Sequence, residues 1–269
     1  MSKQAELERQ LKKVSMEYRK FNAEQQEFAI KEIGRIRLEI IDMLSEYSGS
    51  DGTIKKQRLN KLLRELESIE KLVRDTGMDA LSQVISETAS FTNDGIKKSL
   101  SDVVGAAAIS GVAFDKINKN VLRYMVNRLG ADDLVLSDRV WNFAGDQRAE
   151  LTKVIRSGII RGDSVNTISA NVRKVYDNDA WKIRRLVVTE GNTAHRVATA
   201  YSAQQSQVVK AVRVHRGKAN RPDHRCTQLE LEDRYGMGPG LYKPTDSEIY
   251  MMHINCTGYL TYEIDPKYL

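Results

Sequence analysis

The chain has 269 residues, 41% of them hydrophobic and 29% charged, with a formal net charge of +6 at pH 7. That length suffices for one or two domains with a sizeable core. No run approaches the ~18 apolar residues that span a bilayer, and charges occupy the N-terminal segment where a secretory signal would be hydrophobic. We therefore expect a soluble protein made in the cytosol.

The first half of the chain carries a helical pattern. All four prolines lie after residue 221, so no strong helix breaker interrupts the preceding part. Apolar residues recur at three-and-four spacing over 7–44, and this helix should end near the turn-forming YSGSDGT. A second amphipathic run, 54–73, should pack antiparallel against it, and a third should span about 78–108.

Helix signals continue after a break at RLGADDLVLSD. Ser137 or Asp138 should cap a helix that begins with RVWNF. Gly162 should end that helix, and Ser164 should cap a short one after it. A last long helix is predicted over about 179–205.

The character of the sequence then changes. The segments QVVKAVRVHRG and TGYLTYEI alternate and are rich in β-branched or aromatic residues, as strands are. We predict a mainly α protein: a long N-terminal helical hairpin or bundle followed by a small α+β C-terminal module. The predicted division is 1–135 for the helical part and 136–269 for the module, with helices to about 206 and the α+β part over 207–269.

Catalytic motifs are absent. GMGPG contains proline where a phosphate-binding loop needs backbone donors, and neither a Gly-x-Ser-x-Gly nor a His-Glu-x-x-His motif occurs. A cysteine nucleophile paired with His224 or His253 is compatible with the residue types, but nothing nearby indicates a lowered thiol pKa or an oxyanion site. We expect a protein that is not an enzyme.

The two cysteines and two of the four histidines stand in two short stretches. His224 and Cys226 are two positions apart in HRC, and His253 and Cys256 are three apart in HINC. Two imidazole nitrogens and two thiolates would complete a closed tetrahedral zinc site, which would be structural. In the alternative interpretation the cysteines are small buried residues and the histidines bond locally.

Charged residues suggest two further features. Arg185 and Glu190, with Thr189 between them, could form an ion pair that holds the helix to the module, and His195 on the same helix should be half-buried with its hydrogen bonds satisfied. A basic stretch could contact DNA phosphates, or could be a solvated strand edge protected by charge. The basic residues concerned are Lys210, Arg213, Arg216, Lys218 and Arg221.

These motifs together resemble a known family, the phage minor head or head morphogenesis proteins with a Mu F-like domain. The matching residues are Arg185, Thr189 and Glu190 on the long helix, Arg221, Pro222, Asp223, His224 and Cys226 in the next block, and His253 and Cys256 near the end. The sequence departs from the family pattern at Ile254, where proline is usual, and at Gly258, where a cysteine is usual.

The resemblance implies a structural protein of a tailed-phage virion, made in the host cytoplasm and present in few copies inside the head near the portal. Its implied partners are the portal protein, the major capsid protein or both, and packaged DNA, with no membrane involved in assembly. An alternative is a zinc-stabilised nucleic-acid-binding protein. Some proteins with this module are fused to toxin enzymes, for which we expect no room in this chain.

Overall fold

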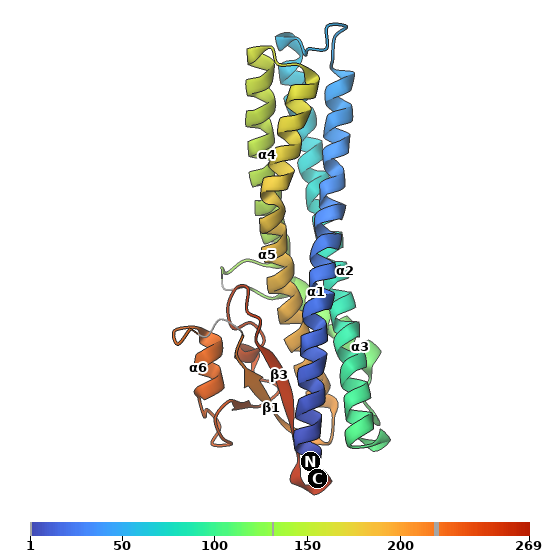
Figure 1. Cartoon of the computed structure of the whole chain (residues 1–269), viewed down its shortest axis with the longest axis vertical. Coiled ribbons are helices and arrows are strands. Elements are labelled where there is room, and N and C mark those ends of the chain that lie inside the picture. The colour runs from blue at the N-terminus through green and yellow to red at the C-terminus, as the bar shows by residue number, and fades with distance from the viewer. Residues whose placement is uncertain (1, 131, 218–220) are drawn as a thin grey trace. The chain divides into compact units, whose positions relative to one another are not determined.

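The structure is a computed structural model that describes residues 2–130, 132–217 and 221–269. The described chain is mainly α-helical with a small antiparallel sheet near the C-terminus (Figure 1), which confirms the predicted fold class. Residue contacts group the chain into two units, each discontinuous in sequence. Because these units are not consecutive along the chain, they do not test the predicted domain boundary near residue 135, which stays a prediction. Unit 1 comprises Met1–Gln25, Ser82–Asp133 and Arg185–Leu269, and unit 2 comprises Gln26–Leu81 and Leu134–Arg184.

The helices are longer than the sequence pattern predicts. The helices of the described chain are α1 (Lys3–Glu46), α2 (Leu59–Val103), α3 (Phe114–Asn127), α4 (Leu136–Arg161), α5 (Val165–Gln205) and α6 (Arg225–Leu231). The end predicted for the first helix is confirmed, whereas α2 and α5 each replace two predicted helices. Gly77 does not end α2; a Cβ there would lie 3.0 Å from Cγ1 of Val140, so the glycine makes room for α4. Helix α3 has no counterpart among the predicted elements.

Unit 2 is built from segments of α1, α2, α4 and α5. Gly162 takes the left-handed conformation (φ 79°) that ends α4, and the Ser164 hydroxyl accepts a hydrogen bond from the Thr167 amide (3.2 Å), as predicted. The Val165 amide donates to the Gly52 carbonyl (2.9 Å), which ties the two helix connections together. The apolar stripes predicted for these helices form the core of the unit. Its members include Ile33, Ile36, Ile40, Leu44, Leu62, Leu66, Val73, Val140, Leu151, Ile155, Ile168 and Val172.

The start of α4 differs slightly from the prediction. The residue that precedes the helix is Val135, whose side chain cannot cap it. The Asp138 carboxylate, three residues inside, accepts a hydrogen bond from the Val135 amide at 3.4 Å. The Asp138 side chain therefore stabilises the N-terminal end of α4 from within its first turn.

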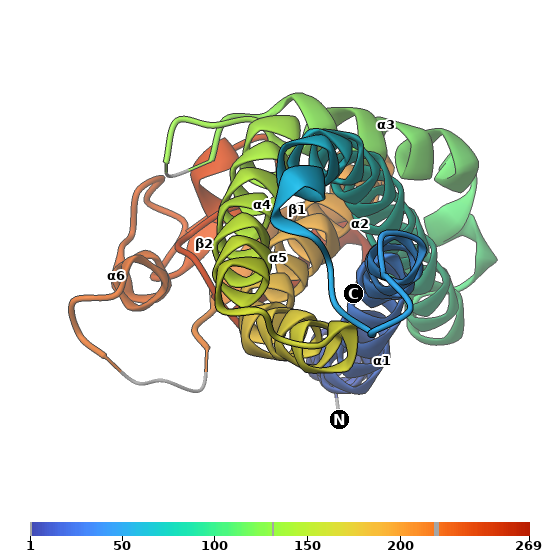
Figure 2. The same ribbon diagram turned by 90° about the horizontal axis from the view of Figure 1, so that it is seen from above.

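Unit 1 contains the sheet. Its strands are β1 (Val209–His215), β2 (Leu241–Tyr242) and β3 (Tyr259–Ile264), in the order β2-β1-β3 with both pairs antiparallel. Both predicted strands are confirmed as β1 and β3. Val212 pairs with Tyr242 on one side and Tyr262 on the other, and all three are fully buried. In both views, α3 and α6 lie on opposite sides of this unit (Figures 1 and 2).

The first turn of α1 covers the exposed edge of β3. The side-chain amide of Gln4 donates to the Tyr262 carbonyl (2.9 Å) and accepts from the Ile264 amide (2.9 Å), so it replaces a neighbouring strand. Lys3 also donates to the Tyr268 carbonyl at 3.3 Å. These bonds keep the two ends of the chain side by side, as Figure 1 shows.

The C-terminal part of α5 runs through the middle of unit 1. Every residue from Thr189 to Ala200 is buried, although several are polar. Gly191 permits close contact with α1, since a Cβ there would lie 2.6 Å from both Tyr18 Oη and Asn22 Nδ2. Polar groups buried on all sides of a helix need partners, and these partners organise the site described below. None of the helices in the described chain has the length and apolar content of a membrane span.

Candidate metal centre

Three of the four predicted metal ligands come together. Side-chain donor atoms of His224, Cys226 and His253 all lie within 4.8 Å of one another. His224 precedes α6 and Cys226 lies in its first turn, whereas His253 belongs to the loop between a short 3-10 helix, Ser247–Ile249, and β3. Cys226 is 1% exposed, and the two histidines are partly exposed. One sulfur and two nitrogens thus face a common point near the surface.

Hydrogen bonds show which ring nitrogens are available. Nδ1 of His253 lies 2.9 Å from the Ile254 carbonyl and must donate to it, which leaves a lone pair on Nε2. That Nε2 lies 3.2 Å from Cys226 Sγ. Nδ1 of His224 is buried and has no hydrogen-bond partner in the described chain. A buried nitrogen without a partner is costly, and a bound metal ion would satisfy it.

The donor set is compatible with zinc. Zinc accepts imidazole nitrogen and thiolate sulfur, and it binds the deprotonated forms of both. Here one thiol, Cys226, would lose its proton, and the His253 ring is already oriented by the carbonyl of the next residue. When bound, a zinc ion would link α6 to the loop before β3.

Cys256 is not part of this group, so the predicted set of four ligands is corrected to three. Its Sγ accepts a hydrogen bond from the Gly258 amide (3.4 Å) and lies 4.0 Å from Met252 Sδ. The loop turns at Asn255, which has a positive φ of 57°, and this turn directs Cys256 into the interior. Spacing along the sequence cannot show this direction.

Arg196 of α5 holds both ends of the loop that carries His253. Its Nε donates to the Tyr250 carbonyl (2.7 Å), and its Nη1 donates to the carbonyls of Gly258 (2.9 Å) and Cys256 (3.2 Å). The side chain is fully buried, and this burial lowers the pKa of Arg196 from its usual value. Sequence reasoning missed this residue, although it lies one helical turn from Thr193 and two from Thr189 on one face of α5.

The predicted ion pair has a different arginine. Glu190 is fully buried, and its Oε2 accepts from Nη2 of Arg128 at 2.6 Å, whereas the Arg185 side chain is exposed. The pair Arg185–Glu190 is therefore corrected to Arg128–Glu190. Thr189 lies next to it and accepts a hydrogen bond from the Asn255 amide at 3.1 Å. The Thr-Glu motif thus holds the loop that carries His253 on one side and the end of α3 on the other.

His195 is buried and its hydrogen bonds are satisfied. Its Nε2 lies 3.2 Å from Ser15 Oγ, its Nδ1 lies 2.7 Å from Thr92 Oγ1, and its ring stacks on Tyr18 with centroids 4.4 Å apart. Burial, with a smaller contribution from the charge of Arg196, lowers the pKa of His195 to about 3. The ring is more deeply buried than predicted, at 3% exposure.

The basic stretch predicted to bind nucleic acid is partly neutralised. Arg213 pairs with Glu263 at 3.1 Å, and Arg216 pairs with Glu230 at 3.0 Å. Lys210 and Arg221 are exposed, and Lys218 lies outside the described residues. This segment is strand β1 and its continuation, so the paired arginines favour the interpretation as a charged strand surface.

We found no match to this chain among protein-family models, curated proteins or solved structures.

Proposed function

We propose that this chain is a non-enzymatic structural protein of a tailed-phage head that acts in head assembly near the portal. The proposal depends on the residues that carry the family resemblance. Some of these residues, from three separate stretches, gather around one loop: Thr189 bonds to Asn255, Cys226 contacts His253, and Cys256 packs behind the turn. Residues that share a motif and also a place in the fold support a common role.

Head particles provide the test. The tagged chain would be expressed during infection by the phage that encodes it, and purified particles would be analysed by quantitative mass spectrometry. We expect a few copies per particle and co-purification with portal or major capsid protein. An untagged particle preparation is the control. Particles that contain portal protein but none of this chain would contradict the proposal.

We propose further that His224, Cys226 and His253 bind one zinc ion that stabilises the C-terminal module. The supporting observations are that His224, Cys226 and His253 bring donor atoms within 4.8 Å of one another, and that Nδ1 of His224 is buried without a hydrogen-bond partner in the described chain. The bound ion would join α6 to the loop before β3, and the residues 232–252 between these points contain little regular structure of their own. A metal that ties such a segment adds its binding energy to the stability of the module.

The two cysteines supply a matched test of this site. Protein purified without chelators should contain about one zinc per chain by elemental analysis. Cys226→Ser should lose it, whereas Cys256→Ser should keep it, because Cys256 lies outside the ligand group. Wild-type protein without near-stoichiometric metal would refute the proposal. Equal loss in the two variants would refute the ligand set.

The alternative of a nucleic-acid-binding protein that uses the stretch from Lys210 to Arg221 is weaker. Two of its arginines already hold carboxylates, so fewer charges remain to release counterions from DNA. Its signature would be DNA binding with a steep dependence on salt concentration that is reduced when Lys210 and Arg221 are replaced by alanine.

A further inference from the structure

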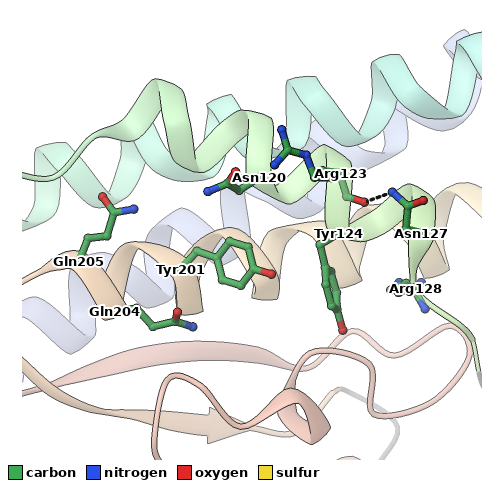
Figure 3. A pocket seen from close by; sticks show the side chains of 8 residues that line it. All are labelled: Asn120, Arg123, Tyr124, Asn127, Arg128, Tyr201, Gln204 and Gln205. Atoms are coloured by element: carbon green, nitrogen blue, oxygen red, sulfur yellow. Dashed lines mark hydrogen bonds between the residues drawn. The ribbon is translucent and has the colours of Figure 1, made fainter.

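A polar groove lies between α3 and the last turn of α5, within unit 1. It has a volume of about 670 Å³. Figure 3 shows its side chains in order along the groove: two glutamines at one end, two tyrosine rings in the middle and Arg128 at the other end. The complete lining is Asn120, Arg123, Tyr124, Asn127, Arg128, Tyr201, Gln204 and Gln205.

Helix α3 packs into the core mainly through the face opposite the groove. This face carries Ile117, Val121 and Met125, which are fully buried. Asn120 and Tyr124 stand four positions apart on the groove side, with Arg123 beside them, so they form a row along about two helical turns. An amphipathic helix usually exposes solvated charges on its outer face, whereas this row combines amides, aromatic rings and cations around a hollow.

Contacts hold the other groove residues in place. Nε2 of Gln204 donates to the Pro244 carbonyl (2.8 Å) and lies 3.0 Å from Tyr250 Oη. Oε1 of Gln205 accepts from the backbone amide that precedes α3, at 3.0 Å. The rings of Tyr124 and Tyr201 meet edge-to-face, with centroids 6.1 Å apart. A groove whose walls are already ordered loses little entropy when it binds a ligand.

The charge of the lining favours an anion. It includes Arg123 and Arg128 but no carboxylate. Arg128 is 7% exposed and its charge is balanced by Glu190, yet its Nε is a buried donor without a partner in the described chain. The Arg123 guanidinium has no partner among the described residues and is exposed. The full positive charge of Arg123 exceeds the roughly half negative charge that the helix dipole places at the C-terminal end of α3.

We infer that this groove binds the phosphate group of a nucleotide, either free or in a single-stranded nucleic acid. Arg123 would bind the phosphate in the fork geometry that guanidinium offers, next to the orphan donor of Arg128. Tyr201 and Tyr124 would contact the base, and the amides of Gln204 and Gln205 would face its polar edge. From Asn120 to Arg128 the groove follows α3 for about 12 Å, which suits one nucleotide. This inference is independent of the metal site and of the head role.

Calorimetric titration of the full-length chain at about 0.15 M salt tests the inference. The probes are thymidine 5′-monophosphate, a short oligothymidylate, inorganic phosphate and uncharged thymidine. Saturable binding of the monophosphate with little binding of thymidine is expected. Tighter binding of the oligothymidylate would identify a strand as the ligand, and equal binding would identify a free nucleotide.

Two variants with a matched control locate the binding. Arg123→Ala should weaken monophosphate binding about tenfold or more, the usual effect of losing a charge-assisted hydrogen bond. Lys119→Ala removes the same charge from an exposed position of α3 outside the groove, and should change binding less than about twofold. Tyr201→Leu should weaken binding of the nucleotide but not of inorganic phosphate. Absence of saturable binding by both nucleotides, or equal effects of the two charge-removing variants, would overturn the inference.

Discussion

Lowering the pH from about 7.5 to about 5 should destabilise the protein through His195. The imidazole is 3% exposed, lies between the hydroxyls of Ser15 and Thr92, and stacks on Tyr18. Burial lowers its pKa to about 3 because a charged ring would be poorly solvated there, and the nearby charge of Arg196 adds to the effect. The native state therefore holds this ring neutral at a pH where the unfolded chain protonates it.

The sign and the size of the effect follow from proton linkage. The unfolded histidine has a pKa of 6.5, so between pH 6.5 and about 3 the unfolded state binds a proton that the native state does not. Stability therefore falls as the pH falls below 6.5. At pH 5 the loss from this residue is about 2 kcal/mol, since each pH unit below 6.5 contributes about 1.4 kcal/mol. His215, whose pKa burial lowers to about 4, acts with the same sign.

Urea unfolding of the wild type and of His195→Gln at the two pH values isolates this contribution. The variant should be less stable at pH 7.5, because it loses hydrogen bonds, but its further loss at pH 5 should be about 2 kcal/mol smaller than that of the wild type. His215→Gln serves as the comparison for the second histidine. If the variant does not fold, an NMR titration of the wild-type His195 ring gives the same information. An equal loss in wild type and variant, or a His195 ring that titrates near pH 6.5, would refute the reasoning.

Three other predictions concern side-chain pairing and packing. Glu190→Gln leaves the buried Arg128 charge without its carboxylate partner, so the free energy of unfolding measured in urea should fall by about 3–5 kcal/mol. A loss below about 1 kcal/mol would show that water reaches the pair. Gly95→Ala should destabilise the protein by about 1–3 kcal/mol, because the added Cβ would lie 2.7 Å from a Val14 methyl. Gly34→Ala should stabilise it by up to about 1 kcal/mol, because nothing lies within 4 Å of the added Cβ and alanine favours the helix. Thermal melts in which both variants shift the melting temperature in the same direction would contradict this. Arg196→Met should weaken zinc retention against a chelator by about tenfold, although it contacts no ligand atom directly, and unchanged retention would remove Arg196 from the support of the site.

The sequence predicted helices well but not where they would be interrupted. Apolar spacing of three and four reports which face of a helix is buried, and this holds whatever the partner is. Interruptions depend on packing instead. Gly77 weakens helix propensity, but its missing side chain is what lets α4 approach, so α2 continues through it. The segment before residue 179 likewise stays helical, because Val175, Tyr176 and Ile183 are buried on both sides of its polar residues.

The ligands of the candidate site could be predicted where they stand close together in the sequence. The pairs HRC and HINC indicated that two stretches share one centre, and three of their four donors do converge. The direction of Cys256 depends on the positive φ of Asn255, and no spacing rule contains this information. Arg128, which pairs with Glu190, lies 62 positions away in sequence, and it directly follows α3, a helix that the sequence pattern did not indicate.

A single buried segment of α5 supports both proposed sites. Arg196 holds the ends of the loop with His253, and Glu190 holds Arg128 at the end of the groove. Both side chains are fully buried, so neither can lose its partner without leaving a charge or several carbonyls unsatisfied. One segment of α5 therefore anchors both the loop that carries His253 and the end of α3.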